Sequence, residues 1–88
     1  YVYVLFSLKD RKLYVGLSNN LIRRLRQHKY GEVKSTRNRR PLILVHYETF
    51  NLKIDAERTE KYLKGGNGRA NLKIKLKYHL SKLRYKHI

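Results

Sequence analysis

Glu60 is an acidic side chain whose place in the sequence calls for an explanation. It lies one helical turn after Ala56 and about one turn before Leu63, so a helix here would carry all three on one inward stripe. Two interpretations fit this position. The carboxylate either pairs with Arg58 or Lys64 and reaches solvent, or it binds a metal ion. Periodicity alone favours the ion pair. The alternative, a metal ligand, would give Glu60 a role in chemistry.

Arg24 and His28 are four residues apart, so on a helix they share one face beside Leu21 and Leu25. Taken singly, Arg24 would contact a phosphate or solvent, and His28 would interact with the C-terminal end of the helix dipole. Together they place two polar groups at the border of an apolar stripe.

Tyr3 and Tyr14 lie in two neighbouring segments that both have strand character. With an even-length connection their side chains share a face of the sheet and come within diagonal reach, whereas an odd-length connection separates them. Packing explains each Tyr as well as chemistry does. Gly16, inside the second segment, indicates the close approach of another backbone or of a ligand.

Composition limits the kind of protein that carries these residues. Eighty-eight residues without Cys predict one domain with a core built by packing alone, since no disulfide or thiolate ligand is available. The four His lack finger-like spacing, which excludes a structural zinc protein. A net charge of +16 attracts polyanions, so nucleic acid is the expected partner. The apolar runs are too short to span a membrane and no signal-peptide pattern opens the chain, so we expect no membrane partner and a cytoplasmic location, nucleoid-associated in a bacterium.

The hydrophobic pattern predicts the first half of an α+β fold. Residues 1–7 and 13–17 are typical of a β-hairpin. Residues 19–29 form an amphipathic helix with Ser18 at its N-cap and Gly31 at its end. Residues 30–41 are a basic surface loop.

The second half continues with strand and helix signals. Residues 42–50 begin with an unbroken apolar run, which predicts a strand at the centre of the sheet. Residues 55–64 form a second helix that Gly65 and Gly66 end. A last helix over about 69–85 follows from one stripe of leucines, although alternation over 72–76 also fits a strand. The stripe comprises Leu72, Leu76, Leu80 and Leu83. We therefore expect a small, mostly antiparallel three-stranded sheet with helices packed on it.

Taken in order, these residues resemble the GIY-YIG nuclease superfamily, and in particular its small stand-alone bacterial members. The resemblance covers positions 1 to about 73, which would be the core of a single catalytic domain over residues 1–88, with a basic C-terminal segment over 74–88. It rests on Tyr1-Val2-Tyr3 and Tyr14-Val15-Gly16, followed at the spacing of the family by Ser18, Asn20, Leu21, Arg24, His28, Ala56, Glu60 and Lys61. Each element is weak alone, whereas the ordered set is specific. Tyr1 replaces the Gly of the first motif, a position that supplies no chemical group.

The resemblance implies hydrolysis of phosphodiester bonds with one divalent cation, Mg²⁺ or Mn²⁺, bound by Glu60. Tyr3, Tyr14, Arg24 and His28 match the other catalytic positions of the family. Arg24 would hold the scissile phosphate, for which a guanidinium is well shaped. One Tyr, assisted by His28, would take a proton from the attacking water. Which Tyr does so is open, with a preference for Tyr3.

The remaining candidates would contact the nucleic-acid backbone. They are Gly16, Lys34, Arg37, Arg39, Arg40, Asn67, Arg69, Lys73, Lys75 and Lys77. Asn67 and Asn71 both fit the Asn that many members carry after the Glu, and Gly68-Arg69 is similar to the small stand-alone subgroup.

We expect the substrate to be DNA rather than RNA, with low sequence specificity or a preference for nicked, branched or single-stranded forms, because 88 residues leave no room for a recognition domain. No obligate protein partner is evident, and we expect a monomer. The alternative function is a non-catalytic basic module that binds nucleic acid. An inward Glu60 argues against it, since this carboxylate would repel phosphate unless a metal ion lay between them.

Overall fold

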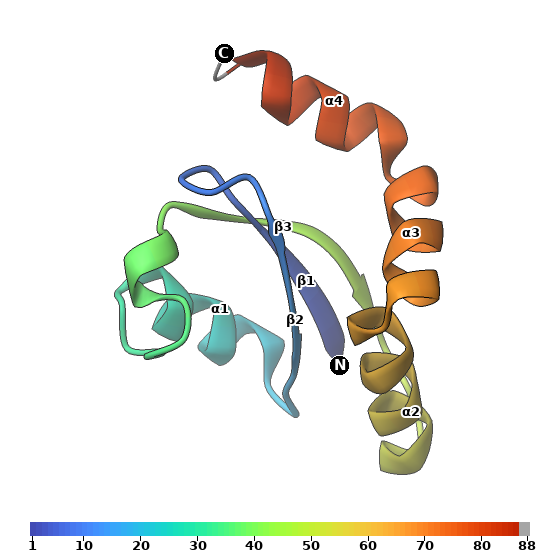
Figure 1. Cartoon of the computed structure of the whole chain (residues 1–88). Helices are drawn as coiled ribbons and strands as arrows, with labels where there is room; N and C mark the ends of the chain where they lie inside the picture. The colour runs from blue at the N-terminus through green and yellow to red at the C-terminus, as the bar shows by residue number, and fades with distance from the viewer. Residues whose placement is uncertain (87–88) are drawn as a thin grey trace.

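A computed structural model describes residues 1–86 of the chain and shows an α+β fold (Figure 1). The predicted hairpin, the antiparallel sheet and the flanking helices are all confirmed. The elements in chain order are β1 (Val2–Ser7), β2 (Leu13–Leu17), α1 (Leu21–Lys29), a 3₁₀ turn η1 (Arg37–Arg39), β3 (Leu42–Glu48), α2 (Lys53–Lys64), α3 (Gly66–Lys75) and α4 (Lys77–Lys86).

The sheet has the strand order β2-β1-β3, and both pairs are antiparallel. The prediction that β3 is central is therefore wrong: β1 is the central strand, and all six of its residues are buried. In β3 only Val45 is buried, since one edge of this strand has no neighbour in the described sheet. An apolar run indicates that side chains are buried, but it does not show whether the strand has a neighbouring strand on both of its edges or on one.

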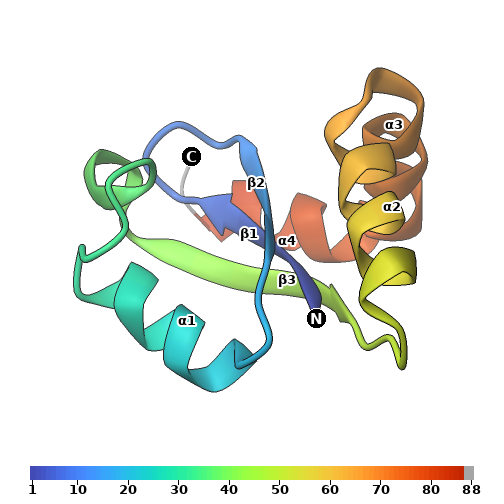
Figure 2. The same ribbon diagram turned by 90° about the horizontal axis from the view of Figure 1, so that it is seen from below.

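Helices cover both faces of the sheet (Figures 1 and 2). Helix α1 lies on one face, and α2, α3 and α4 lie on the other. Val2, Val4 and Phe6 of β1 point into an apolar core with residues of α2, α3 and α4. Because side chains alternate along a strand, Tyr3, Leu5 and Ser7 point to the opposite face.

Two helix ends differ from the sequence predictions. Asn20, not Ser18, is the N-cap of α1: its Oδ1 accepts the Arg23 N–H at 3.1 Å, while the Ser18 hydroxyl accepts the Asn20 N–H. The predicted last helix is two helices that meet at Leu76. The leucine stripe nevertheless packs against the core along its whole length. None of the described helices is long and apolar enough to cross a membrane.

Candidate active site

A chain of three buried side chains links the sheet to α1 and to the loop after it. The Tyr3 hydroxyl lies 2.8 Å from His28 Nε2, and His28 Nδ1 lies 2.7 Å from Thr36 Oγ1. The exposed fractions of Tyr3, His28 and Thr36 are 0%, 1% and 0%. Tyr3 and His28 are predicted site residues that the fold brings into contact. Thr36 was not predicted, because nothing in the loop sequence ties it to His28.

The environment keeps this chain of hydrogen bonds uncharged. Burial, with the nearby Arg24, lowers the pKa of His28 to about 4, so its imidazole is neutral at pH 7. Burial raises the pKa of Tyr3. A neutral imidazole has one donor and one acceptor. The Thr36 hydroxyl is 3.5 Å from the Val33 carbonyl, so it can donate there and accept from His28 Nδ1, which leaves Nε2 to accept the Tyr3 proton.

Arg24 is held next to the hydrogen-bonded side chains of Tyr3, His28 and Thr36. Its Nε donates to the Tyr3 hydroxyl at 3.3 Å, and its Nη1 donates to Gln27 Oε1 at 3.1 Å. Gln27 was not predicted, although a residue three positions later on a helix is a natural partner. Nη2 takes part in neither bond. The guanidinium is therefore oriented before any ligand arrives.

Tyr14 lies beside Tyr3 and His28. The register of the hairpin, which pairs Tyr3 with Gly16 and Leu5 with Tyr14, decides between the two alternatives left open by the sequence and places both Tyr on one face. The ring centroid of Tyr14 is 6.5 Å from that of Tyr3 and 5.4 Å from that of His28. Tyr14 is half-buried, and its hydroxyl accepts a 3.4 Å hydrogen bond from the exposed Ser35. Tyr14 therefore reaches solvent and the fully buried Tyr3 does not. Which of the two Tyr accepts the proton stays a prediction.

Gly16 makes the position of Tyr3 possible. A Cβ at Gly16 would overlap Tyr3 Cζ, which no side chain can tolerate. The close approach predicted for Gly16 is thus that of a Tyr ring from the adjacent strand, rather than of a backbone or a ligand. Its placement among the nucleic-acid contacts stays a prediction.

Glu60 projects from α2 with 23% of its side chain exposed, and its Oε2 lies 3.3 Å from Lys64 Nζ. The ion-pair interpretation is therefore realised in this structure. We call Tyr3, Tyr14, Arg24 and His28 the tyrosine cluster. The charge of Glu60 acts on it, because Glu60 contributes to the raised pKa of Tyr3, although less than burial does. Among the residues described, no group of three or more His, Asp or Glu could hold a metal ion. Any cation here would rely on this one carboxylate.

The predicted basic loop residues have partners within the protein. Arg37 Nε donates to the Gly31 carbonyl, and Arg40 Nε donates to the Arg37 carbonyl. Arg39 pairs with Asp10 at 2.6 Å and lowers the pKa of that carboxyl to about 2. These hydrogen bonds and the ion pair fix the loop. Among the loop residues predicted to contact nucleic acid, Lys34 is exposed and makes no such bond among the interactions described.

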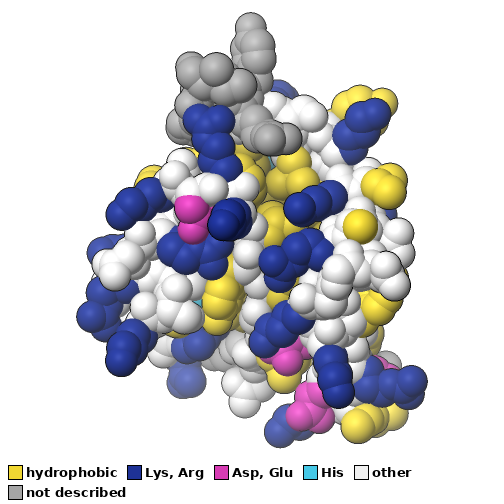
Figure 3. Space-filling model, in the orientation of Figure 1, with side chains coloured by type: hydrophobic (Ala, Val, Ile, Leu, Met, Phe, Trp, Pro, Cys, Tyr) yellow, Lys and Arg dark blue, Asp and Glu magenta, His cyan; other side chains and the backbone are white. Residues whose placement is uncertain are grey.

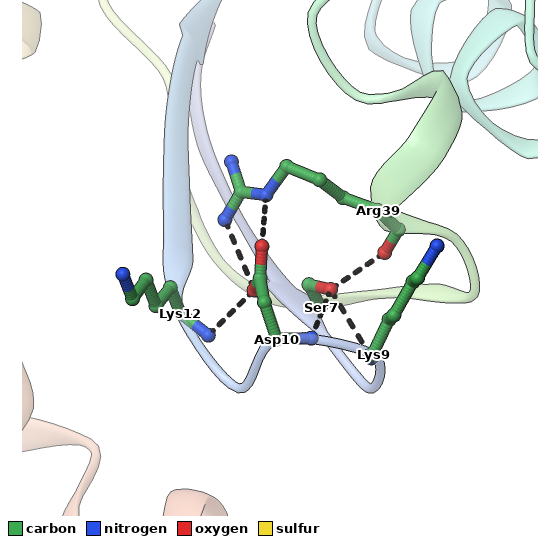
Figure 4. A network of polar contacts seen from close by, with 5 residues as sticks. All are labelled: Ser7, Lys9, Asp10, Lys12 and Arg39. Carbon is green, nitrogen blue, oxygen red and sulfur yellow. Dashed lines mark hydrogen bonds and ion pairs between the residues drawn. The ribbon is translucent and has the colours of Figure 1, made fainter.

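Figure 4 shows how Arg39 joins the loop to the turn of the hairpin. The Ser7 hydroxyl donates to the Arg39 carbonyl and accepts the N–H groups of Lys9 and Asp10. Asp10 also accepts the Lys12 N–H, so both ends of the turn are held by side chains.

The candidates of the C-terminal helices lie apart from the tyrosine cluster. Asn67 is exposed, and Asn71 donates to the Tyr62 hydroxyl at 2.8 Å, so neither hydrogen-bonds to the cluster. Lys75 is exposed on α3. Arg69, Lys73 and Lys77 line a pocket with residues of the hairpin turn.

Comparisons with known proteins show the family of the chain. Residues 1–75 match the family model of the GIY-YIG catalytic domain. A UPF0213 protein of Clostridium perfringens is 45% identical over 65 residues, which cover 73% of this chain and 69% of that protein. A UPF0213 protein of Staphylococcus haemolyticus is 37% identical over 75 residues, covering 84% and 90%. One of Natronomonas pharaonis is 46% identical over 65 residues, covering 73% and 75%. No solved structure matches the chain significantly.

Proposed function

The chain belongs to the GIY-YIG family, whose catalytic domain is that of a nuclease, and from this premise we propose that it is a metal-dependent endonuclease that cuts DNA rather than RNA. The observation that carries the proposal is the oriented Arg24, held by the buried Tyr3 beside the solvent-accessible Tyr14. The bonds to Tyr3 and Gln27 leave Nη2 of this guanidinium available for a phosphate.

Arg24 would bind the scissile phosphate through the side of its guanidinium that Tyr3 and Gln27 leave available. A guanidinium that is already oriented stabilises charge on phosphate oxygens without reorganising during the reaction. Tyr3 and His28 act as positioning residues, because their hydrogen bonds hold Arg24 in place.

Tyr14 would take the proton from the attacking water. A phenol acts as a base where positive charge stabilises the phenolate, and Arg24, on the same side of the sheet as Tyr14, would supply that charge. Tyr14→Phe and Tyr3→Phe form a matched pair: the first should stop cleavage without loss of stability, and the second should also destabilise the fold because it leaves His28 Nε2 unpaired.

Glu60 would hold the divalent cation. Mg²⁺ keeps several waters and accepts one or two protein oxygens, so a single carboxylate is sufficient. The structure fits this role, because the side chain is largely buried and its present partner, Lys64, is 54% exposed and can move aside. A bound cation supplies charge that neutralises the phosphate and favours deprotonation of water.

We propose weak sequence preference, with nicked, branched or single-stranded DNA cut in preference to plain duplex. The basic side chains near the site are suited to phosphates, and phosphate contacts carry no sequence information.

The test is a cleavage time course on labelled single-stranded, nicked, branched and duplex DNA and on RNA, with Mg²⁺, with Mn²⁺ and with chelator. Glu60→Gln should lower the cleavage rate by at least about 10²-fold, whereas Glu57→Gln, an exposed neighbour on the same helix, should not. Products that persist in chelator or in Glu60→Gln would overturn the metal role. Tight binding without products under any condition would favour the alternative, a non-catalytic module.

A further inference from the structure

A basic pocket lies between the turn of the hairpin and helices α3 and α4, outside the tyrosine cluster. We call it the hairpin pocket. Its cavity volume is about 280 Å³. Its apolar and small lining residues are Phe6, Leu13, Leu80 and Ser81. Five cations complete the lining: Arg11, Lys12, Arg69, Lys73 and Lys77. Figure 3 shows Lys and Arg side chains on both sides of a hydrophobic strip on this face of the molecule.

Two segments far apart in the sequence supply these charges. Arg11 and Lys12 come from the turn, and the other three come from the C-terminal helices at intervals of four residues. None of the described lining residues is acidic. Lys12, Lys73 and Lys77 carry like charges that repel one another, and an anion bound among them reduces that repulsion.

Arg69 gives independent evidence, because it buries a hydrogen-bond donor that has no acceptor in the described protein. Its Nε is buried and has no hydrogen-bond partner, and among the described side chains it is the one polar atom in that condition. Burying a donor of a charged group without an acceptor is unfavourable. A phosphate oxygen is the acceptor that a guanidinium binds best.

The pocket and the tyrosine cluster are neighbours across one strand. Leu13 lines the pocket and Tyr14 belongs to the cluster, and consecutive strand residues point to opposite faces of the sheet. Strand β2 is an edge of the sheet. A nucleic-acid strand that passes over this edge can therefore reach both places with different phosphates.

We propose that the hairpin pocket binds a second phosphate group of the nucleic-acid substrate, away from the scissile bond, and so anchors the strand across β2. This rests on the proposed function and adds a specific anchoring site to it. The phosphate is either an internal diester or the monoester at a strand end. Both present the same oxygens to the pocket.

The test measures binding and not cleavage, so a failure of catalysis does not affect it. Fluorescence anisotropy would follow a labelled single-stranded oligonucleotide bound to Glu60→Gln protein over a series of salt concentrations. Lys73→Gln/Lys77→Gln removes two pocket cations. Lys53→Gln/Lys82→Gln removes the same charge from exposed helix positions outside the pocket.

The pocket variant should reduce the slope of log affinity against log salt by about 0.7, the value for one lost phosphate contact on a single strand. The control pair should leave the slope nearly unchanged. Equal changes in the two variants would overturn the proposal, because they would show a diffuse charge effect.

Two further measurements make the test specific. The NMR signal of Arg69 Nε–H should shift when oligonucleotide or inorganic phosphate is added, and an unmoved signal at saturation would overturn the proposal. Oligonucleotides with a 5′- or 3′-phosphate should then be compared with hydroxyl-ended ones. If oligonucleotides with phosphorylated ends bind more tightly and the pocket variant loses this difference, the pocket binds the monoester. If both kinds of oligonucleotide bind equally, the pocket binds the internal diester.

Discussion

The two faces of strand β1 carry different kinds of side chain. On the face covered by α2, α3 and α4, Val2, Val4 and Phe6 enter a core made of apolar groups. On the face covered by α1, the buried residues include Tyr3 and Ser7, and their polar atoms have partners. A small domain thus separates two kinds of burial within six residues: one face provides stability by apolar packing, and the other, which we call the polar face, holds hydrogen-bonded polar groups in fixed geometry. Several measurements test this separation.

The largest expected effect is on the apolar face. Leu63→Ala should lower the free energy of unfolding by about 2–5 kcal/mol, because it leaves a cavity in the core. Urea denaturation would measure it, with the exposed Leu52→Ala as control, for which we expect a change within about 0.5 kcal/mol. The cleavage rate per folded molecule should stay the same. A stability loss as small as that of the control would show that the faces are not divided in this way.

On the polar face, Arg24→Lys should reduce the cleavage rate by about 10²–10³-fold, since an ammonium cannot reproduce the fork that is held by Tyr3 and Gln27. The melting temperature should change little. Arg23→Lys, on the exposed side of the same helix, is the matched control and should cleave normally. Equal activity of the two variants would remove Arg24 from the reaction.

Acid should weaken the polar face first. The pKa of His28 is about 4 in the fold and 6.5 as its ordinary value, so between these values the unfolded chain binds more protons. The stability contributed by neutral His28 is complete above pH 6.5 and is lost as the pH falls to 4, by up to about 3 kcal/mol. Urea unfolding at pH 7, 6, 5 and 4 would measure this loss, and His28→Gln should flatten it.

A second acid transition belongs to the turn of the hairpin. The pKa of Asp10 is lowered to about 2, so its contribution to stability is lost only as the pH falls from about 4 toward 2. A single transition between pH 4 and 2, with nothing above it, would contradict the role given to His28.

Gly16→Ala should bring a smaller loss of about 1–3 kcal/mol, because the new Cβ would overlap the Tyr3 ring and force it to move. Cleavage should fall with it, since Arg24 would lose its partner. Gly66→Ala is the control, because its Cβ would meet open space. If Gly16→Ala were fully stable and active, the packing of Tyr3 over β2 would be wrong.

The smallest expected effect is that of Thr36→Val, about 1 kcal/mol of unfolding free energy, since His28 Nδ1 would lose its partner. Thr36→Ser should keep the hydroxyl and most of the stability. NMR of the imidazole nitrogens would show whether the proton on His28 moves from Nδ1 in the Val variant. An unchanged spectrum would show that the hydrogen bond to Thr36 does not fix the His28 proton on Nδ1.

Local patterns were sufficient to predict much of this arrangement. A four-residue helical spacing predicted that Arg24 and His28 share one face of a helix. Alternation along the hairpin left two possibilities for Tyr3 and Tyr14, and only the register of the structure decides that they share a face. Long-range pairing was not accessible in the same way. The apolar run of β3 did not distinguish an edge strand from a central one, and the contact of Thr36 with His28 depends on a loop path fixed by the Arg39–Asp10 pair. The hairpin pocket joins residues more than fifty positions apart, which no local spacing reveals.

The open edge of β3 bears on how copies of this protein behave toward one another. Within residues 1–86 no strand pairs with the outer side of Leu42–Glu48, a segment without Lys or Arg. Such an edge is a template for strand pairing between molecules, and a lysine on the strand is the usual protection. Here the one acidic side chain of the strand, Glu48, lies at its end, and the molecule as a whole adds protection because copies that each carry +16 repel before their edges meet. Colloidal stability in this protein is therefore a function of ionic strength, and it is lowest where salt or bound polyanion screens that charge.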